Sequence, residues 1–361
     1  MKVGIITYHR PINYGAVLQA VALNRKLKSL DIDSTIIDYR NKVQEKAINN
    51  NHFFTANGLK NKIKSLILAK KTKTREIKFR AFLEKNSSLT CPYTEKTIKN
   101  ANTKFDIFVS GSDQVWNMDL NGEDYNYLLK FVQKDKKKVS IASSFGYSEI
   151  PEKYRKKTIK YLMKFNNLTT REDAGSKIIK QELNKKAEVM LDPTLLLNKN
   201  EWLELSEKPK LKLPAEYILF YAVSPTEEDI KAARQLSSKH NMPIVVINYN
   251  KRHIKGMINC FDIGPSEFVW LIENSKFVIT NSFHGTAFSI NLNKEFFVRL
   301  STKKNNGNSR IETLLNIVGV QNRYVENIDN AEKVDWDMVN NKLNKKRKAC
   351  IGLINKYINM E

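Results

Sequence analysis

Cysteine is scarce in this sequence, and none of it is paired for chemistry. Cys91, Cys260 and Cys350 are far apart, and no CxxC pair occurs. Three separated cysteines indicate reduced thiols rather than a disulfide framework or a zinc site. The chain also lacks His, Asp, Glu and Cys clusters at metal-ligand spacing, a Walker loop and a GxSxG turn. We therefore expect no metal and no cofactor, and no serine-hydrolase chemistry.

Long apolar runs are absent as well. The longest, such as "YILFYAV" at 217–223, have the length of buried strands, not the roughly 20 residues of a membrane-spanning helix. The opening "MKVGIITYHR" lacks the apolar length and the small-residue cleavage site of a signal peptide. We expect a cytoplasmic protein, whose only membrane contact would be peripheral, at the inner face.

Acidic residues are too few to balance the basic ones. The 61 Lys and Arg against 38 Asp and Glu give a net charge of +23, a field that attracts phosphates, anionic lipid and acidic polymers. Most lysines are scattered, as on solvated faces. The segment 58–83, however, places Ile63, Leu66 and Ile67 on one face among basic residues. Such a helix either lies on an anionic membrane or packs its apolar stripe on the core.

Strands and helices alternate through both halves of the chain, which predicts parallel sheets covered by helices. The expected strands are 2–8, 34–39, 105–110, 138–143, 167–171 and 187–191, then 217–223, 243–248, 261–264, 277–280 and 295–300. We predict an α/β protein of two Rossmann-like doubly wound domains facing across a cleft: 1–197, with a basic helical insert at 42–100, and 198–335. A long C-terminal helix, 336–361, is expected to pack back across the hinge. Ligands of such folds bind outside the carboxyl ends of the strands.

Three strand exits of the first domain carry candidate residues. Asn13 can cap a helix in which Gly15 leaves backbone N–H groups free for an anion or a sugar oxygen, although a tight turn also explains the glycine. Asp113, in "SGSDQVWN", can hold a sugar hydroxyl or act as a base, or it can cap the next turn. Arg171 suits a carboxylate or phosphate, unless Glu172 and Asp173 pair with it locally.

In the second domain, polar residues gather where a strand runs into a helix: Asn281, Ser282, His284, Gly285 and Thr286. A phosphate or carboxylate site needs donors at a helix start. The positive end of the helix disfavours protonation of the imidazole in an empty site, whereas a bound anion favours it. An anionic ligand would therefore help to protonate the histidine that acts as its acid. Alternatively, His284 bonds a backbone carbonyl. Asn308 and Arg310 begin another helix and offer a second cation.

Taken together, these stretches resemble the polysaccharide pyruvyl transferase family. The resemblance is carried by "NYGAVLQAVAL" (13–23), "SGSDQVWN" (110–117), "SIASSFG" (140–146), "TTRED" (169–173), "LDPTLLL" (191–197), "ITNSFHGTAFSINLNKEFFV" (279–298) and "NSRIETLLN" (308–316). It implies a fold like that of GT-B glycosyltransferases. It also implies transfer of pyruvate from phosphoenolpyruvate to a sugar of a bacterial-type surface polysaccharide or its precursor, as a cyclic ketal, with release of phosphate. The implied partners are phosphoenolpyruvate and a sugar or lipid-linked oligosaccharide; no nucleic acid is expected.

The resemblance also assigns roles. Arg171 and His284 match an arginine and a histidine that contact phosphoenolpyruvate in relatives, whereas Ser282 stands where relatives carry a second arginine, which Arg310 or Arg299 would replace. We predict His284 and Asp113 as the catalytic acid and base. The predicted substrate-binding residues are Arg171, Ser282, Gly285, Thr286, Asn308, Arg310, Asn13 and Gly15. The alternatives are a sugar-nucleotide glycosyltransferase of the same architecture and, from the net charge, a non-catalytic nucleic-acid or polyanion-binding protein.

Overall fold

The computed structural model describes residues 1–50, 59–248, 253–302 and 307–359. The first domain is built on a parallel sheet in the order β2-β1-β3-β4. Its strands are β1 (Lys2–Ile6), β2 (Asp33–Ile36), β3 (Ile107–Ser110) and β4 (Lys137–Ser140). The short parallel pair β5 (Thr169–Thr170) and β6 (Glu188–Val189) extends this sheet beyond β4 through single bridges from Val139 and Ser143. Helices α1 (Tyr14–Lys28), α5 (Glu152–Leu162) and α6 (Asp173–Leu183) connect the strands.

The second domain repeats this plan with a five-stranded parallel sheet in the order β11-β10-β7-β8-β9. The strands are β7 (Ile218–Tyr221), β8 (Ile244–Ile247), β9 (Ile258–Cys260), β10 (Phe277–Thr280) and β11 (Glu295–Val298). Its main helices are α9 (Glu227–His240), α10 (Pro265–Glu273), α11 (Phe283–Asn291) and α12 (Asn308–Val318). Two parallel sheets with connecting helices are what the alternation predicts.

One expected strand is wrong. Residues 261–264 are not a strand; β9 ends before them, at Cys260. The reason is the start of α10, because the Glu267 side chain turns back to accept a hydrogen bond from the Gly264 backbone N–H at 2.7 Å. This cap fixes 261–264 as the turn into a helix.

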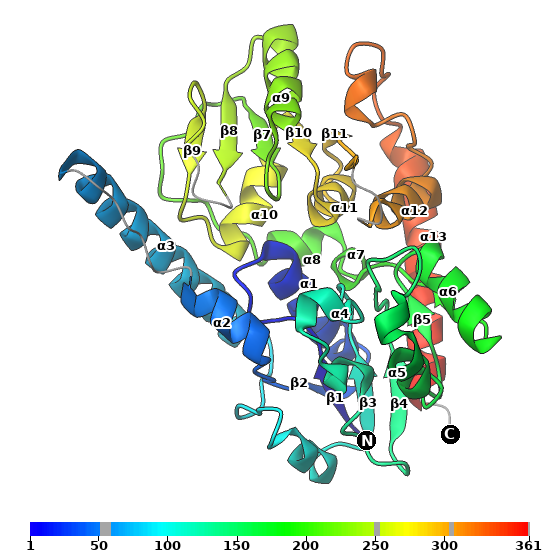
Figure 1. Cartoon of the computed structure of the whole chain (residues 1–361). Helices are drawn as coiled ribbons and strands as arrows, with labels where there is room; N and C mark the ends of the chain where they lie inside the picture. Colours follow the sequence, from blue (N-terminus) through cyan, green and yellow to red (C-terminus); the bar gives the residue numbers. More distant parts are fainter. Residues whose placement is uncertain (51–58, 249–252, 303–306, 360–361) are drawn as a thin grey trace.

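Short helices α7 (Pro193–Leu196) and α8 (Lys199–Leu203) lead from the first sheet to the second, and the last helix, α13 (Trp336–Asn359), passes beside both domains (Figure 1). It packs on α12 and on α7. The thiol of Cys350 accepts a hydrogen bond from the Leu191 backbone N–H at 3.4 Å. The terminal helix therefore packs against the crossover between the domains. Within the described ranges, no helix is long and apolar enough to cross a membrane.

The basic insert contains α2 (Lys42–Asn50) and α3 (Leu59–Asn86). Ile63, Leu66 and Ile67 fall among side chains that lie outside the described part, so their stripe stays a prediction. The rest of α3 lies beside α10 of the second domain (Figure 1). There Lys78 Nζ contacts both carboxylate oxygens of Glu267 at 2.7 Å. For this part of α3 the structure favours packing on the protein over lying on a membrane.

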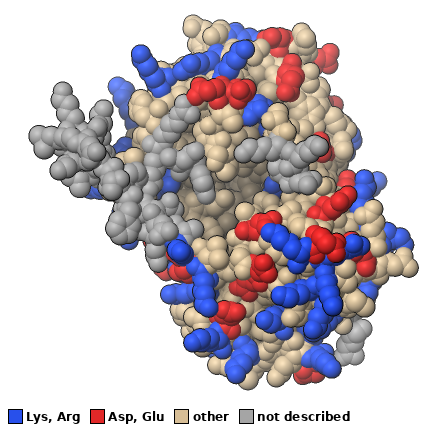
Figure 2. All heavy atoms as spheres, viewed as in Figure 1, with Lys and Arg blue, Asp and Glu red and all other residues tan. Residues whose placement is uncertain are grey.

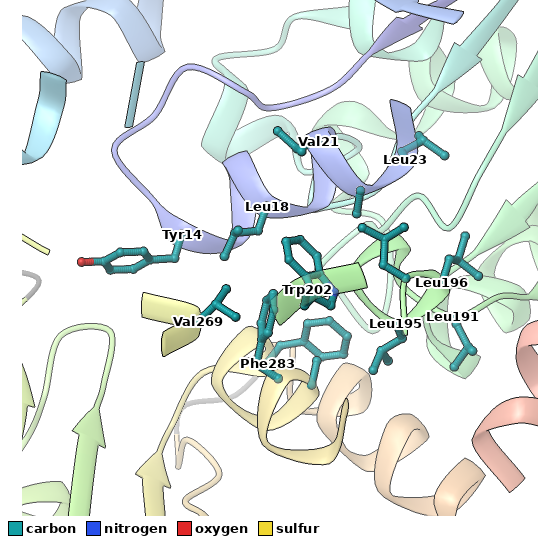
Figure 3. Packing of buried hydrophobic residues seen from close by; sticks show 14 of the residues in the cluster. Tyr14, Leu18, Val21, Leu23, Leu191, Leu195, Leu196, Trp202, Val269 and Phe283 are labelled. Atoms are coloured by element: carbon teal, nitrogen blue, oxygen red, sulfur yellow. The ribbon is translucent and has the colours of Figure 1, made fainter. Parts of the chain in front are cut away.

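The domain interface is apolar over much of its area and is organised by α1. The Tyr14 ring stacks on Phe268 with centroids 4.4 Å apart, and its hydroxyl donates to the Ile263 carbonyl at 2.8 Å. Leu18 and its neighbours in α1 face Val269, Trp202 and Phe283 (Figure 3). Because these residues belong to one hydrophobic cluster that runs through both domains, the N-terminal end of α1 is held at the interface.

On the face of the molecule shown in Figure 2, charge is spread rather than gathered in one stripe. On the face in Figure 2, Lys and Arg are scattered over both domains with Asp and Glu among them, and a recess lies between the two halves. This distribution agrees with solvated lysines more than with a nucleic-acid track.

Candidate active site

Arg171 is the buried cation at the end of β5. Its side chain is 1% exposed, and Nη1 donates to Asp192 Oδ2 at 3.0 Å. The guanidinium lies 4.5 Å from the ring centroid of Phe283, from the second domain. Burial opposes its charge, but Asp192, Asp113 and Glu172 together raise the pKa of Arg171 above its ordinary value. Nε and Nη2 are buried and have no hydrogen-bond partner in the described structure. Arg171 is therefore a permanent cation with two unused donors.

Asp192 lies between Arg171 and His284 and is close to both. Its Oδ1 accepts from the backbone N–H and the hydroxyl of Thr194 at 3.0 and 2.7 Å, and its Oδ2 accepts from Ser112 Oγ at 2.8 Å and from Arg171. Burial alone would raise the pKa of Asp192, but the neighbouring His284 and Arg171 hold it well below its usual range. Asp192 is not among the site residues predicted from the sequence. The available signal was its position in "LDPTLLL", between a strand and the helix α7 that it caps.

His284 faces the first domain from the start of α11. Its Nε2 lies 3.6 Å from Asp192 Oδ2. On the other side of the ring, a Cβ added to Gly15 would overlap Nδ1, so only glycine allows α1 to come this close. Among the described contacts the ring makes no hydrogen bond to a backbone carbonyl, and its side chain is 9% exposed. The imidazole is thus enclosed between the domains and points across the interface.

The start of α11 is closed by its own side chains. Ser282 caps the helix, its hydroxyl accepting from the Gly285 N–H at 3.5 Å. A side chain at Gly285 would overlap the Thr280 hydroxyl. Thr286 is fully buried, and its hydroxyl donates to the Ser282 carbonyl at 3.1 Å. These three residues hold the turn that presents His284, and their contact with a ligand stays a prediction.

Arg310 approaches Arg171 from α12 of the second domain. Its Nε donates to the Gly307 carbonyl at 3.1 Å, and Gly307 has a φ of 76° and no side chain that would collide with the guanidinium. Burial and the like charge of Arg171 lower the pKa of Arg310 to about 10. Among the described residues no carboxylate lies within 4 Å of its nitrogens, whereas Arg299 Nε pairs with the buried Asp229 at 2.7 Å. Of the two arginines considered, Arg310 is the one free to meet an anion.

Glu172 is a second residue that the sequence analysis did not select as a site. It is 1% exposed, and its Oε1 accepts from Ser144 Oγ at 2.9 Å. The other oxygen, Oε2, is buried without a partner and lies 3.9 Å from Arg171 Nε. Burial raises the pKa of Glu172 in spite of the opposing charges of Arg171 and Arg310. The expected local pairing of Glu172 with Arg171 is therefore loose.

The remaining predicted residues divide into two groups. Asp113 lies next to the site: its Oδ1 is 3.6 Å from Arg171 Nη2 and also accepts from the Gln114 N–H at 2.9 Å, at a left-handed φ of 71°. It therefore caps its own turn and faces the cation as well. Asn13 caps α1, accepting from the Ala16 N–H at 3.3 Å, and Asn308 bonds the backbone of Ser301 at 3.1 and 2.8 Å. Ligand contacts for Asn13 and Asn308 stay predictions.

The arrangement can bind an anion and move a proton. Within the described ranges, Arg171 offers two donors without a partner and Arg310 adds a charge that no carboxylate pairs. His284 follows the carboxyl end of β10 and faces the first domain. No three His, Cys, Asp or Glu side chains are placed to hold a metal ion in the part of the chain that the structure describes.

Comparisons with known proteins agree with this architecture. The family model for polysaccharide pyruvyl transferase matches residues 13–300. Among solved structures, S. aureus MnaA in a co-structure with UDP is 11% identical, over 100% of this chain and 97% of that chain, with a TM-score of 0.51. The UDP-GlcNAc 2-epimerase from Neisseria meningitidis bound to UDP-GlcNAc is 12% identical, over 99% and 100%, with a TM-score of 0.50. Such distant similarity shows the fold alone, and it confirms the expected GT-B-like architecture. No curated protein matches the sequence.

Proposed function

Because the chain belongs to the polysaccharide pyruvyl transferase family, we propose that it transfers pyruvate from phosphoenolpyruvate to a sugar as a cyclic ketal and releases phosphate. One observation carries the proposal. Buried Arg171 has two unused donors at the interface where His284 and an unpaired Arg310 approach from the other domain. Unmet hydrogen-bonding capacity of this kind is costly in a protein interior and is explained by a ligand.

Phosphoenolpyruvate suits these cations because it carries a carboxylate and a phosphate. Arg171 and Arg310 come from different domains, so an anion between them would neutralise two like charges at once. The N-terminal end of α11 adds positive potential for the phosphate. Ser282 stands where relatives have an arginine, and Arg310 supplies the missing charge.

His284 is proposed as the general acid. It protonates the methylene carbon of the donor, so that C2 becomes cation-like and a sugar hydroxyl adds there. Phosphate leaves, and a neighbouring hydroxyl closes the ketal. Both ring nitrogens face the first domain, so the contact between Gly15 and His284 must loosen for the donor to enter.

A phosphate-release assay tests the reaction directly. Phosphoenolpyruvate is supplied with a panel of nucleotide-linked and lipid-linked sugars, and mass analysis identifies a product that has gained a pyruvyl ketal. His284→Ala should lower turnover by about 10² to 10⁴ while the circular dichroism spectrum is unchanged. Near wild-type phosphate release by this variant would contradict the role of His284.

Arg310→Gln tests the donor site. We expect the KM for phosphoenolpyruvate to rise about 10- to 100-fold, because a hydrogen bond to a charged group contributes roughly 1.5–3 kcal/mol. The fold should tolerate the change, since Arg310 has no carboxylate partner among the described residues. Arg234→Gln, at an exposed position of α9, is the matched control. An unchanged KM in Arg310→Gln would show that the donor binds elsewhere.

A sugar-nucleotide glycosyltransferase is the second candidate, favoured by the UDP and UDP-GlcNAc in the two similar structures. A thermal-shift measurement separates the two functions. Stabilisation by UDP- or GDP-sugars but not by phosphoenolpyruvate would favour the glycosyltransferase. The reverse result would favour pyruvyl transfer.

A further inference from the structure

Glu172 has one carboxylate oxygen fixed and one left free. Oε1 accepts a hydrogen bond from Ser144 Oγ at 2.9 Å, in the loop after β4. Oε2 is buried and has no partner in the described structure, although the residue is only 1% exposed. A buried carboxylate oxygen without a donor is costly, so the native site calls for a donor at this position.

The groups around Glu172 decide which ligand can supply that donor. Arg171 Nε lies 3.9 Å from Oε2, and Arg310 approaches from α12. Arg171 also lies close to the carboxylates of Asp113 and Asp192. Asp192 in turn lies next to His284. Fully ionised phosphoenolpyruvate has only acceptor atoms. It can satisfy the unused nitrogens of Arg171, but it offers nothing to Glu172 Oε2. A sugar hydroxyl offers one donor.

We therefore infer that Glu172 binds the attacking hydroxyl of the acceptor sugar through Oε2 and removes its proton. This inference rests on the proposed pyruvyl transfer and names the base of that reaction. It assigns to Glu172 the role predicted above for Asp113, whose Oδ1 already accepts from the Gln114 N–H and faces Arg171.

The proton balance of the reaction closes with this assignment. The hydroxyl oxygen forms a bond to C2 as the C2–C3 π pair takes a proton from His284, and the hydroxyl proton passes to Glu172. The C2–O bond to phosphate then breaks, and Glu172 returns its proton to the departing phosphate oxygen. The second sugar hydroxyl closes the ketal at C2, and its proton restores His284. One hydroxyl proton ends on the new methyl group and the other on phosphate.

Glu172→Gln tests the assignment, with Glu182→Gln as the control; Glu182 lies in α6, the helix that Glu172 precedes, and pairs with Arg155 away from the site. Binding is measured with phosphoenolpyruvate alone, and turnover with phosphoenolpyruvate plus methyl hexosides and UDP-hexosamines. We expect Glu172→Gln to bind phosphoenolpyruvate within about threefold of wild type and to lose about 10²- to 10⁴-fold in turnover. Glu182→Gln should match wild type in both.

The pH profile separates a base from a structural carboxylate. A base works only when deprotonated, so wild-type turnover should fall on the acid side, and Glu172→Gln should abolish that limb. The inference is overturned if Glu172→Gln keeps turnover within threefold of wild type. It is also overturned if the slower variant keeps the acid limb while Asp113→Asn removes it. Failure of wild type itself to bind phosphoenolpyruvate would instead refute the proposed function.

Discussion

The two parts of the domain interface are built on opposite principles. Around Tyr14 the aromatic rings stack closely, and the polar atoms are used: the tyrosine hydroxyl bonds Ile263, and Trp202 Nε1 donates to the Thr194 carbonyl at 2.8 Å. Around Arg171, in contrast, two donors of Arg171 itself, Nε and Nη2, and the Glu172 acceptor Oε2 are buried without a hydrogen-bond partner in the described structure. The apolar part holds the domains together by packing. The polar part contains buried donors and acceptors that are available for a ligand, because they have no partner in the described structure. With the proposed function, stability and binding are assigned to separate parts of one interface.

Phe268→Ala should break the apolar part and have the largest effect. Phe268 is fully buried and contacts the rings of Tyr14, Tyr221 and Phe288. We expect the free energy of unfolding to fall by about 3–5 kcal/mol, the usual result of deleting a buried ring. Urea denaturation measures it. A loss below about 1 kcal/mol would show that this packing does not hold the domains.

Asp192→Asn tests a carboxylate of the polar part whose two oxygens both accept hydrogen bonds. The variant leaves Arg171 buried without its closest counter-charge, and we expect a loss of about 3 kcal/mol at neutral pH. Because the pKa of Asp192 is lowered in the folded state, its contribution is complete above about pH 4 and is lost as the pH falls below that. The difference from wild type should therefore shrink in acid. A pH-independent difference would contradict this account.

Gly15→Ala tests the place where α1, from the apolar part of the interface, comes close to His284 in the polar part. The new methyl group would overlap the His284 ring, so either the imidazole or α1 must move. We expect a stability loss of roughly 1–3 kcal/mol and a fall of about 10² in turnover. Gly352→Ala is the control, because Gly352 is an exposed position in α13 with open space around it. That substitution should be neutral or gain roughly 0.5–1 kcal/mol.

Glu172→Gln should have the smallest effect on stability, and of the opposite sign. Burial raises the pKa of Glu172, so wild-type stability falls as the pH rises from about 4 through the folded-state pKa. Removing the charge should stabilise the free protein at neutral pH by about 1 kcal/mol, even though turnover is lost. The gain should vanish below about pH 4. A loss of stability at neutral pH would mean that the Glu172 carboxylate stabilises the fold, as the apolar part of the interface does.

Much of the fold was predictable because its signals are local. Strand and helix alternation gave both sheets, and Asn13 and Ser282 cap the helices that they precede. Residues 261–264 were misassigned because the deciding contact, from Glu267 to Gly264, appears only once the helix has formed. Within the site, Arg171 and His284 could be selected from their places at strand exits. Asp192 and Glu172 were not selected, because a carboxylate beside a helix start is usually explained by the helix itself.

The sequence by itself determined which elements form and which residues leave the strands at their carboxyl ends, since both depend on neighbours a few positions away. Only the tertiary structure decided that Arg171, Asp192 and His284 lie together, and that Arg299 pairs with Asp229 while Arg310 meets no carboxylate among the described residues. That outcome depends on how closely two domains approach. The approach is set by the packing of α1 and by the absence of a side chain at Gly15.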